Sequence, residues 1–124
     1  MKVGIVGSRN FNDYDYLVQI LSQIDATTIV SGGANGADAL GERYARELNI
    51  PTIIHKPEWD LYGRAAGMIR NKLIIDDSEL VVAFWDDKSP GTKNSIDRAT
   101  KDMKKLLIVH YLVKKVECIN FGGK

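Results

Sequence analysis

The chain alternates short, continuously apolar runs with longer segments in which apolar residues recur at helical spacing. The short runs predict β-strands at residues 3–6, 27–30, 52–54, 80–85 and 106–109, with a further edge strand at 116–121. The periodic segments predict a helix capped by Asn12 and helices over residues 37–48, 65–76 and 96–103. Residues 56–63 and 86–93 are expected to be loops.

This order of elements, in which strands alternate with helices, predicts an α/β fold. Most of the predicted strands are apolar at every position, as is typical of strands covered by helices on both faces. We therefore expect a Rossmann-like, doubly wound, mainly parallel five-stranded sheet with helices on both faces. A chain of 124 residues suits one domain over 1–124, with 110–124 as a C-terminal extension or edge strand.

Three loops with unusual chemistry follow strands of the predicted sheet. They are Gly7-Ser8-Arg9-Asn10, Gly32-Gly33-Ala34-Asn35-Gly36 and Ser89-Pro90-Gly91-Thr92-Lys93-Asn94-Ser95. Because the carboxyl ends of parallel strands meet at one edge of a sheet, we expect these loops to lie together. Glycine lets a ligand approach the backbone closely, and a helix N-terminus adds free N–H groups and partial positive charge. The sequence therefore predicts a site for a phosphate-bearing ligand.

Each of these loops also has a purely structural interpretation. Asn35 and Asp38 have the spacing of a capping box, which would satisfy the start of the helix without a ligand, and Thr92 is a candidate for an ordinary N-cap. The loops contain neither GxGxxG nor a closing GK[ST], so no dinucleotide cofactor is implied. No metal is expected either, because the histidines lack metal-ligand spacing with Cys118.

Composition and charge restrict the expected cellular location of the protein and the classes of molecule that it is expected to bind. Apolar residues make up 44% and charged residues 27% of the chain, which is normal for a soluble globular protein. No apolar run approaches the length of about 18 residues that crosses a bilayer, and the first residues lack the features of a signal peptide, so we expect a cytoplasmic protein. The formal net charge of +1 argues against nucleic acid or an anionic membrane as the main partner.

Four sequence motifs, taken together, resemble those of a known protein family. They are GSRNF at 7–11, SGGANGAD at 31–38, WDLYGRAAGMIRN at 59–71 and FWDDKSPGT at 84–92. In combination they resemble the YspA-related branch of the SLOG superfamily, whose relatives include the LOG phosphoribohydrolases and the DNA-processing protein A domain. The resemblance covers about residues 1–110. It implies a Rossmann-like fold, a pocket for nucleotides or nucleotide-derived molecules such as ADP-ribose-type signals, and a homo-oligomer.

The resemblance carries over to particular residues with one important departure. LOG enzymes use an arginine on the third helix, which Arg70 matches, and a glycine-threonine loop, which Gly91 and Thr92 match. Their catalytic glutamate, three residues after the threonine, is replaced by Ser95. Serine neither stabilises an oxocarbenium-like state nor activates water as a carboxylate does. The catalytic residues, if there are any, are therefore not identified.

Arg70 and Asn71 are expected to contact the ligand, because the planar guanidinium binds phosphate in two places. Trp59 is expected either to stack on a base or to cover the edge of the core. The predicted ligand-binding residues are Gly7, Ser8, Arg9, Gly32, Gly33, Asn35, Gly36, Asp38, Trp59, Arg70, Asn71, Pro90, Gly91 and Thr92.

Three functions remain open at this point. The missing glutamate favours a module that binds a nucleotide-derived small molecule in order to sense or sequester it. The first alternative is a nucleotide N-glycosidase or phosphoribohydrolase, for which Asp86 and Asp87 are candidate acids or simply solvated loop charges. The second alternative is single-stranded DNA binding.

Overall fold

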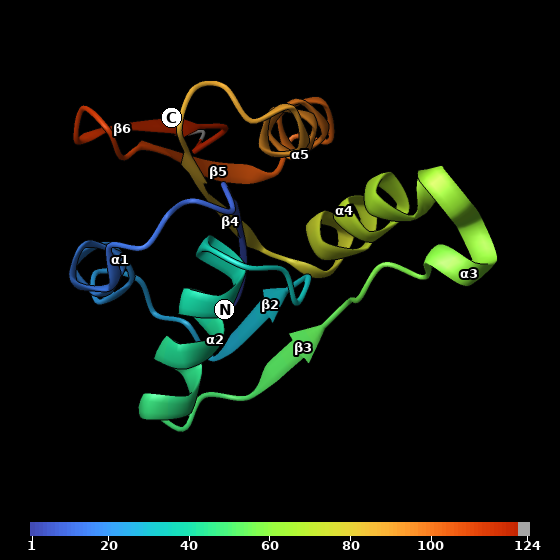
Figure 1. Cartoon of the computed structure of the whole chain (residues 1–124). Helices are drawn as coiled ribbons and strands as arrows, with labels where there is room; N and C mark the ends of the chain where they lie inside the picture. The colour runs from blue at the N-terminus through green and yellow to red at the C-terminus, as the bar shows by residue number, and fades with distance from the viewer. Residues whose placement is uncertain (122–124) are drawn as a thin grey trace.

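The computed structural model describes residues 1–121 as a six-stranded sheet flanked by helices (Figure 1). In chain order the elements are β1 (Lys2–Gly7), α1 (Tyr14–Leu21), β2 (Thr28–Ser31), α2 (Ala37–Glu47), β3 (Thr52–Ile54), α3 (Trp59–Tyr62), the 3₁₀ turn η1 (Gly63–Ala65), α4 (Ala66–Asp77), β4 (Leu80–Trp85), α5 (Pro90–Lys101), β5 (Lys105–His110) and β6 (Lys115–Ile119). The last residues of the predicted C-terminal extension, 122–124, lie outside the described part.

The strand order is β3-β2-β1-β4-β5-β6, and every pairing is parallel except that of β6 with β5. The chain moves outward from β1 to β3, crosses back to β4 and continues to the other edge, so its direction of winding reverses between β1 and β4. This arrangement confirms the predicted Rossmann-like fold, including the C-terminal edge strand.

Alternation along the central strands divides the core into two layers. Val3 and Ile5 of β1 pack with α1 and α2 on one face, whereas Val6 packs with α4 and α5 on the other. In β4, Val82 and Phe84 lie in the first layer and Val81 and Ala83 in the second. Since side chains alternate across a strand, a strand that is apolar throughout must be covered on both faces, as expected.

The structure differs from the sequence-based expectation at element boundaries. Asp13, not Asn12, is the N-cap of α1, because its carboxylate accepts the N–H of Tyr16 at 3.1 Å. The segment 56–63, predicted to be a loop, contains α3, a single helical turn too short for a periodic pattern to reveal. Within residues 1–121, no helix has both the length and the apolar character needed to cross a membrane.

Candidate ligand-binding pocket

A cavity of about 330 Å³ lies beyond the carboxyl ends of β1 and β4, where the winding reverses. Its volume falls in the range that is usual for small-molecule sites. The wall is formed by Val6, Gly7, Ser8, Arg9, Asn10, Ala34, Asp38, Arg70, Asn71, Ile74, Ser89, Pro90, Gly91, Thr92 and Ser95. The structure thus brings together the loop after β1, the start of α5 and one face of α4, which hold eight of the predicted residues, and Asp38 of α2 is the ninth.

Five predicted residues are not on this wall: Gly32, Gly33, Asn35, Gly36 and Trp59. Gly36 serves a structural purpose, since its φ is +76° and a Cβ there would collide with the backbone of Ser8 and Arg9. The glycine therefore allows the loop after β2 to approach the loop after β1 closely. Trp59 lies in α3 and lines a separate hollow with residues 57–61.

The loop after β2 is held by the protein's own carboxylate. The N–H groups of Gly32 and Ala34 donate to Oδ2 of Asp38, at 3.0 and 3.3 Å. These amides are therefore not free for a ligand, which corrects the expectation for this loop. The capping-box interpretation is also wrong, because α2 begins at Gly36 without any side-chain cap and Asp38 reaches back to the loop instead.

The charged residues of the wall are Arg9, Asp38 and Arg70. Burial raises the pKa of Asp38 to about 6, although the hydrogen bonds from the loop and the charge of Arg70 oppose the shift.

Nη1 of Arg70 donates to the carbonyl oxygen of Gly32 and its Nε donates to Oδ1 of Asn71, each at 3.0 Å. Burial lowers the pKa of Arg70 from its usual value, while Asp38 opposes this. Nη2 makes no hydrogen bond within the described residues and is available to a ligand.

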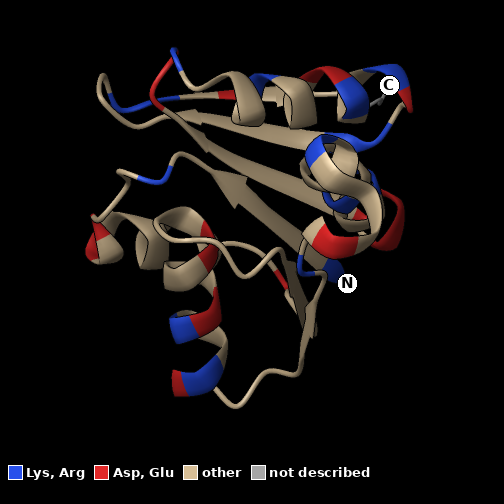
Figure 2. Cartoon of the chain, turned by 45° about the vertical axis from the view of Figure 1, so that its right-hand side comes forward, with Lys and Arg blue, Asp and Glu red and all other residues tan. Residues whose placement is uncertain are grey.

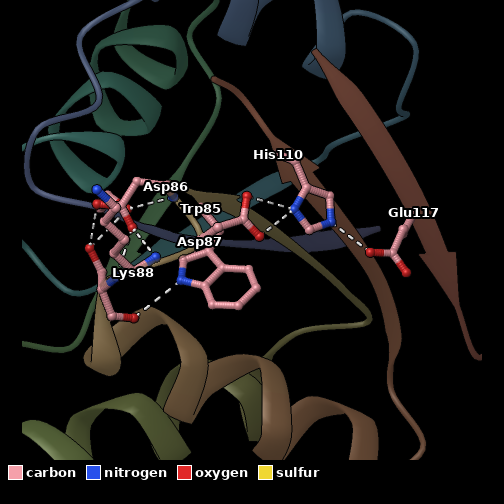
Figure 3. A network of polar contacts seen from close by, with 8 residues as sticks. Trp85, Asp86, Asp87, Lys88, His110 and Glu117 are labelled. Carbon is pink, nitrogen blue, oxygen red and sulfur yellow. Dashed lines mark hydrogen bonds and ion pairs between the residues drawn. The ribbon is translucent and has the colours of Figure 1, made fainter. Parts of the chain in front are cut away.

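The loop before α5 is fixed by Asp86 (Figure 3). Its carboxylate accepts the N–H groups of Lys88 and Ser89 at 2.9 and 2.7 Å, and the Ser89 hydroxyl at 2.9 Å. Although burial acts to raise the pKa of Asp86, these hydrogen bonds outweigh it and hold the pKa below its usual value. The Asp86 N–H in turn donates to Oγ of Ser8 at 3.2 Å, and the hydroxyl oxygens of Ser8 and Ser89 lie 3.1 Å apart, within hydrogen-bond distance. This network joins the start of α5 to the loop after β1.

The first turn of α5 carries free donors. Pro90 is its first residue and has no N–H to leave unsatisfied. The N–H groups of Gly91 and Thr92 donate to no group among residues 1–121, and both residues line the cavity. The cap is Ser89 rather than Thr92, which is the third residue of the helix and buried. Sequence reasoning missed Ser89 as a wall residue, although its position before a proline is a typical helix-start signal.

The candidate catalytic groups are engaged elsewhere or absent from the wall. Asp86 binds the N–H groups of its own loop. Asp87 contacts Nδ1 of His110 at 2.8 Å, and Figure 3 shows His110 between Asp87 and Glu117. Ser95, in place of the glutamate, is buried and its hydroxyl lies 3.4 Å from the carbonyl oxygen of Gly91. Asp38 supplies the carboxylate of the wall. Within the described part of the chain, no three His, Cys, Asp or Glu side chains gather as a metal site would require.

Comparison with known proteins finds similarity at the levels of family, whole chain and fold. The family described as YspA, cpYpsA-related SLOG matches residues 1–62. The Gene 61 protein of Mycobacterium phage D29 is 28% identical over 134 residues, which cover 99% of this chain and 98% of that protein. DNA processing protein A from Helicobacter pylori, solved for its single-stranded DNA binding mode, is similar in structure, with a TM-score of 0.65 and 26% identity. This match covers 87% of our chain and 64% of that chain, so our chain spans less than two thirds of its length.

The structural similarity overturns one expectation. The near-neutral net charge was taken as an argument against a nucleic acid partner, and this inference is wrong, because a protein of the same fold binds single-stranded DNA. Net charge is a sum over the whole surface, whereas a bound strand meets only local groups. Figure 2 shows Lys and Arg interspersed with Asp and Glu on the helices, so a balanced total is compatible with local basic sites.

The family match agrees with the position of the motifs. It covers half of the 124 residues and extends from β1 to the end of α3. GSRNF at 7–11 and SGGANGAD at 31–38, the loops that meet at Gly36, both fall inside it. The chain therefore belongs to the YspA, cpYpsA-related SLOG family.

Proposed function

We propose that the pocket binds a nucleotide or a nucleotide-derived small molecule, such as an ADP-ribose-type signal, through a phosphate group. The observation that carries this proposal is the pair of free N–H groups of Gly91 and Thr92 at the start of α5. α5 has 12 residues, long enough to develop partial positive charge at this end. Free amides and a helix N-terminus inside a cavity form a site for an oxyanion.

Side chains around these amides suit the same ligand. Arg70 stands on α4 across the cavity with Nη2 unoccupied, and a guanidinium matches the geometry of phosphate oxygens. The buried Thr92 and Ser8 add hydroxyl groups to the wall. The network through Asp86 holds the loops on both sides in place before a ligand arrives. Such preorganisation reduces the entropy cost of binding.

The residues of the pocket wall suit binding of a nucleotide without cleavage better than they suit hydrolysis of its N-glycosidic bond. The carboxylate of Asp38 is occupied by two amides of the loop after β2, and the position of the LOG glutamate holds Ser95. Incubation with AMP or ADP-ribose tests this point. We expect both molecules to be recovered intact after saturable binding, and release of free base would favour the enzyme.

The variant Arg70→Ala tests the site itself. We expect it to weaken the binding of AMP, measured by calorimetry, by more than tenfold. Because Arg70 also donates to Gly32, Arg70→Lys is included to keep a charge at the position while removing the fork. Arg46→Ala is the matched control, since it removes the same charge from an exposed position in the last turn of α2. A folded Arg70→Ala variant with undiminished affinity would contradict the proposal.

Single-stranded DNA is the second candidate, favoured by the similarity to DNA processing protein A. A phosphate of the strand would then occupy the site at α5. We expect AMP to compete with a short oligonucleotide if both use this pocket. An oligonucleotide that binds with the same affinity when AMP saturates the protein would have to use another surface.

A further inference from the structure

An exposed aromatic side chain lies in the short helix that precedes α4, the helix that carries Arg70. Trp59 is 54% exposed and belongs to α3, which stands beyond the N-terminal end of α4, away from the sheet (Figure 1). No residue of α3 is buried, so Trp59 does not cover the edge of the core. Large exposed aromatic groups are common where a protein binds another molecule.

The indole of Trp59 rests on the first turn of α4 at Gly67. A Cβ added to Gly67 would stand 3.7 Å from Cη2 of the indole, an ordinary van der Waals distance. An alanine would also fit at this position, so the contact does not depend on glycine. The edge of the indole at Cη2 therefore lies near α4, while Trp59 as a whole remains 54% exposed.

Helical periodicity connects this support to the pocket. Gly67, Arg70, Asn71 and Ile74 are spaced i, i+3, i+4 and i+7, so they follow one face of α4. The last three line the cavity. Gly67 is thus about one helical turn, about 5 Å along the axis, from Arg70.

We propose that Trp59 is the base-binding wall of the nucleotide site. This inference rests on the proposed function and adds to it the recognition of a nucleobase. The phosphate binds the amides of α5 and the guanidinium of Arg70, and the base of the same nucleotide stacks on the open face of the indole. Stacking accepts every base because each has a π-face, so this wall favours nucleotides over other phosphates without selecting a particular base.

The charges next to Trp59 favour this occupant over an anionic lipid surface. Glu58 and Asp60 flank the ring in the chain and would repel an anionic membrane, whereas a nucleobase is uncharged and the phosphate of its nucleotide would bind at α5. Continuity with the pocket through α4 supplies a phosphate site at a suitable distance. A protein partner or a second copy on α3 would leave nucleotide affinity independent of Trp59, so the same experiment distinguishes these occupants.

The test compares AMP with ribose 5-phosphate, which has the phosphate but no base. For the unsubstituted protein we expect AMP to bind about tenfold more tightly. Trp59→Ala should reduce the affinity for AMP to that for ribose 5-phosphate and leave the latter unchanged. Trp59→Phe should retain most of the preference for AMP, because a phenyl ring still stacks. Leu112→Ala is the matched control, since Leu112 is 66% exposed in the turn between β5 and β6, outside both pockets, and should affect neither ligand.

The outcomes separate this inference from the proposed function. If neither AMP nor ribose 5-phosphate binds, the proposed function fails and the base-binding wall fails with it. If both bind but Trp59→Ala leaves the affinity for AMP unchanged, the wall alone is refuted. An oligonucleotide of deoxyadenosines, titrated in parallel, shows whether the stacked base comes from a free nucleotide or from a strand. In either case Trp59→Ala should weaken binding by about tenfold.

Discussion

The most unusual residue of the pocket is Asp38, a buried carboxylic acid in its wall. Asp38 is 5% exposed and accepts two backbone N–H groups from the loop after β2. An ionised carboxylate on the wall would repel a phosphate, so its protonation state should influence affinity. Since burial raises the pKa of Asp38 to about 6, this carboxyl group changes charge in a range accessible to measurement.

Asp38→Asn should strengthen the binding of AMP several-fold at pH 7, because the amide oxygen can still accept from Gly32 and Ala34 while the negative charge is removed. As pH falls from 7 to 5, the carboxyl of the unsubstituted protein gains its proton and the repulsion disappears. The advantage of the variant should therefore shrink toward acidic pH. The ligand's own phosphate also titrates near pH 6, and its loss of one negative charge weakens the same repulsion toward acidic pH. A ratio of the two affinities that stays constant between pH 5 and 7 would contradict the role given to this charge.

Gly36 and Gly91 provide a matched pair of substitutions. Gly36→Ala places a Cβ against the backbone of Ser8 and Arg9 at a φ of +76°, so we expect the free energy of unfolding to fall by at least about 2 kcal/mol. Gly91→Ala places its Cβ where no atom lies within 4 Å, and the change should stay within about 0.5 kcal/mol. Urea denaturation measures both values. Equal effects would mean that the close approach of the two loops is not rigid.

At the scale of elements, His110 ties the loop before α5 to the edge of the sheet. Its Nδ1 contacts Asp87 at 2.8 Å and its Nε2 contacts Glu117 of β6 at 2.6 Å (Figure 3). Both ring nitrogens can donate only when the imidazole is protonated. Burial acts to lower the pKa of His110, but the two carboxylates outweigh it and raise the pKa above the ordinary value of 6.5.

A group whose pKa is raised in the folded state binds more protons when folded than when unfolded. The stabilisation from His110 should therefore be complete below pH 6.5 and be lost as pH rises through the raised pKa. We expect the free energy of unfolding to decline as pH rises above 6.5, and His110→Gln to remove that decline. Asp38, with a pKa of about 6, titrates mainly below this range.

The elements that periodicity predicted are those with a continuous apolar pattern. Every strand and the four longer helices follow directly from such patterns, because burial on the sheet requires them. The short helix α3 has no buried residue, and so it left no apolar stripe to recognise. The start of α5 was placed too late, since Pro90 and Gly91 are usual in turns and also suit a first helical turn.

The candidate site was predictable where it depends on topology. Loops after β1 and β4 meet at the reversal of winding whatever their side chains do, so Ser8 and Thr92 share one cavity. The loop after β2 shows the limit of local sequence. Glycines there allow close approach, but the sequence does not reveal whether the partner is a ligand or Asp38 and the neighbouring backbone.

At the scale of the whole molecule, charge is nearly balanced, with a formal net charge of +1. Figure 2 shows residues of both signs interspersed along the chain, so net charge does not distinguish a single anion site from a surface that binds a strand. Salt dependence separates the two candidate functions. A strand held through several phosphates releases counterions from each of them, whereas a single anion site engages one.

We therefore expect a short single-stranded oligonucleotide bound only through the pocket to show a weak salt dependence. The logarithm of its affinity should fall with the logarithm of salt concentration with a slope of about −0.7, the value for one phosphate contact. The affinity of Arg70→Ala for the same strand should then be low at every salt concentration, because the variant lacks the guanidinium that grips that one phosphate. A slope of about −2 or steeper would instead mean that about three phosphates are engaged. The strand would then follow a surface beyond the cavity, and single-stranded DNA would replace the small molecule as the better candidate.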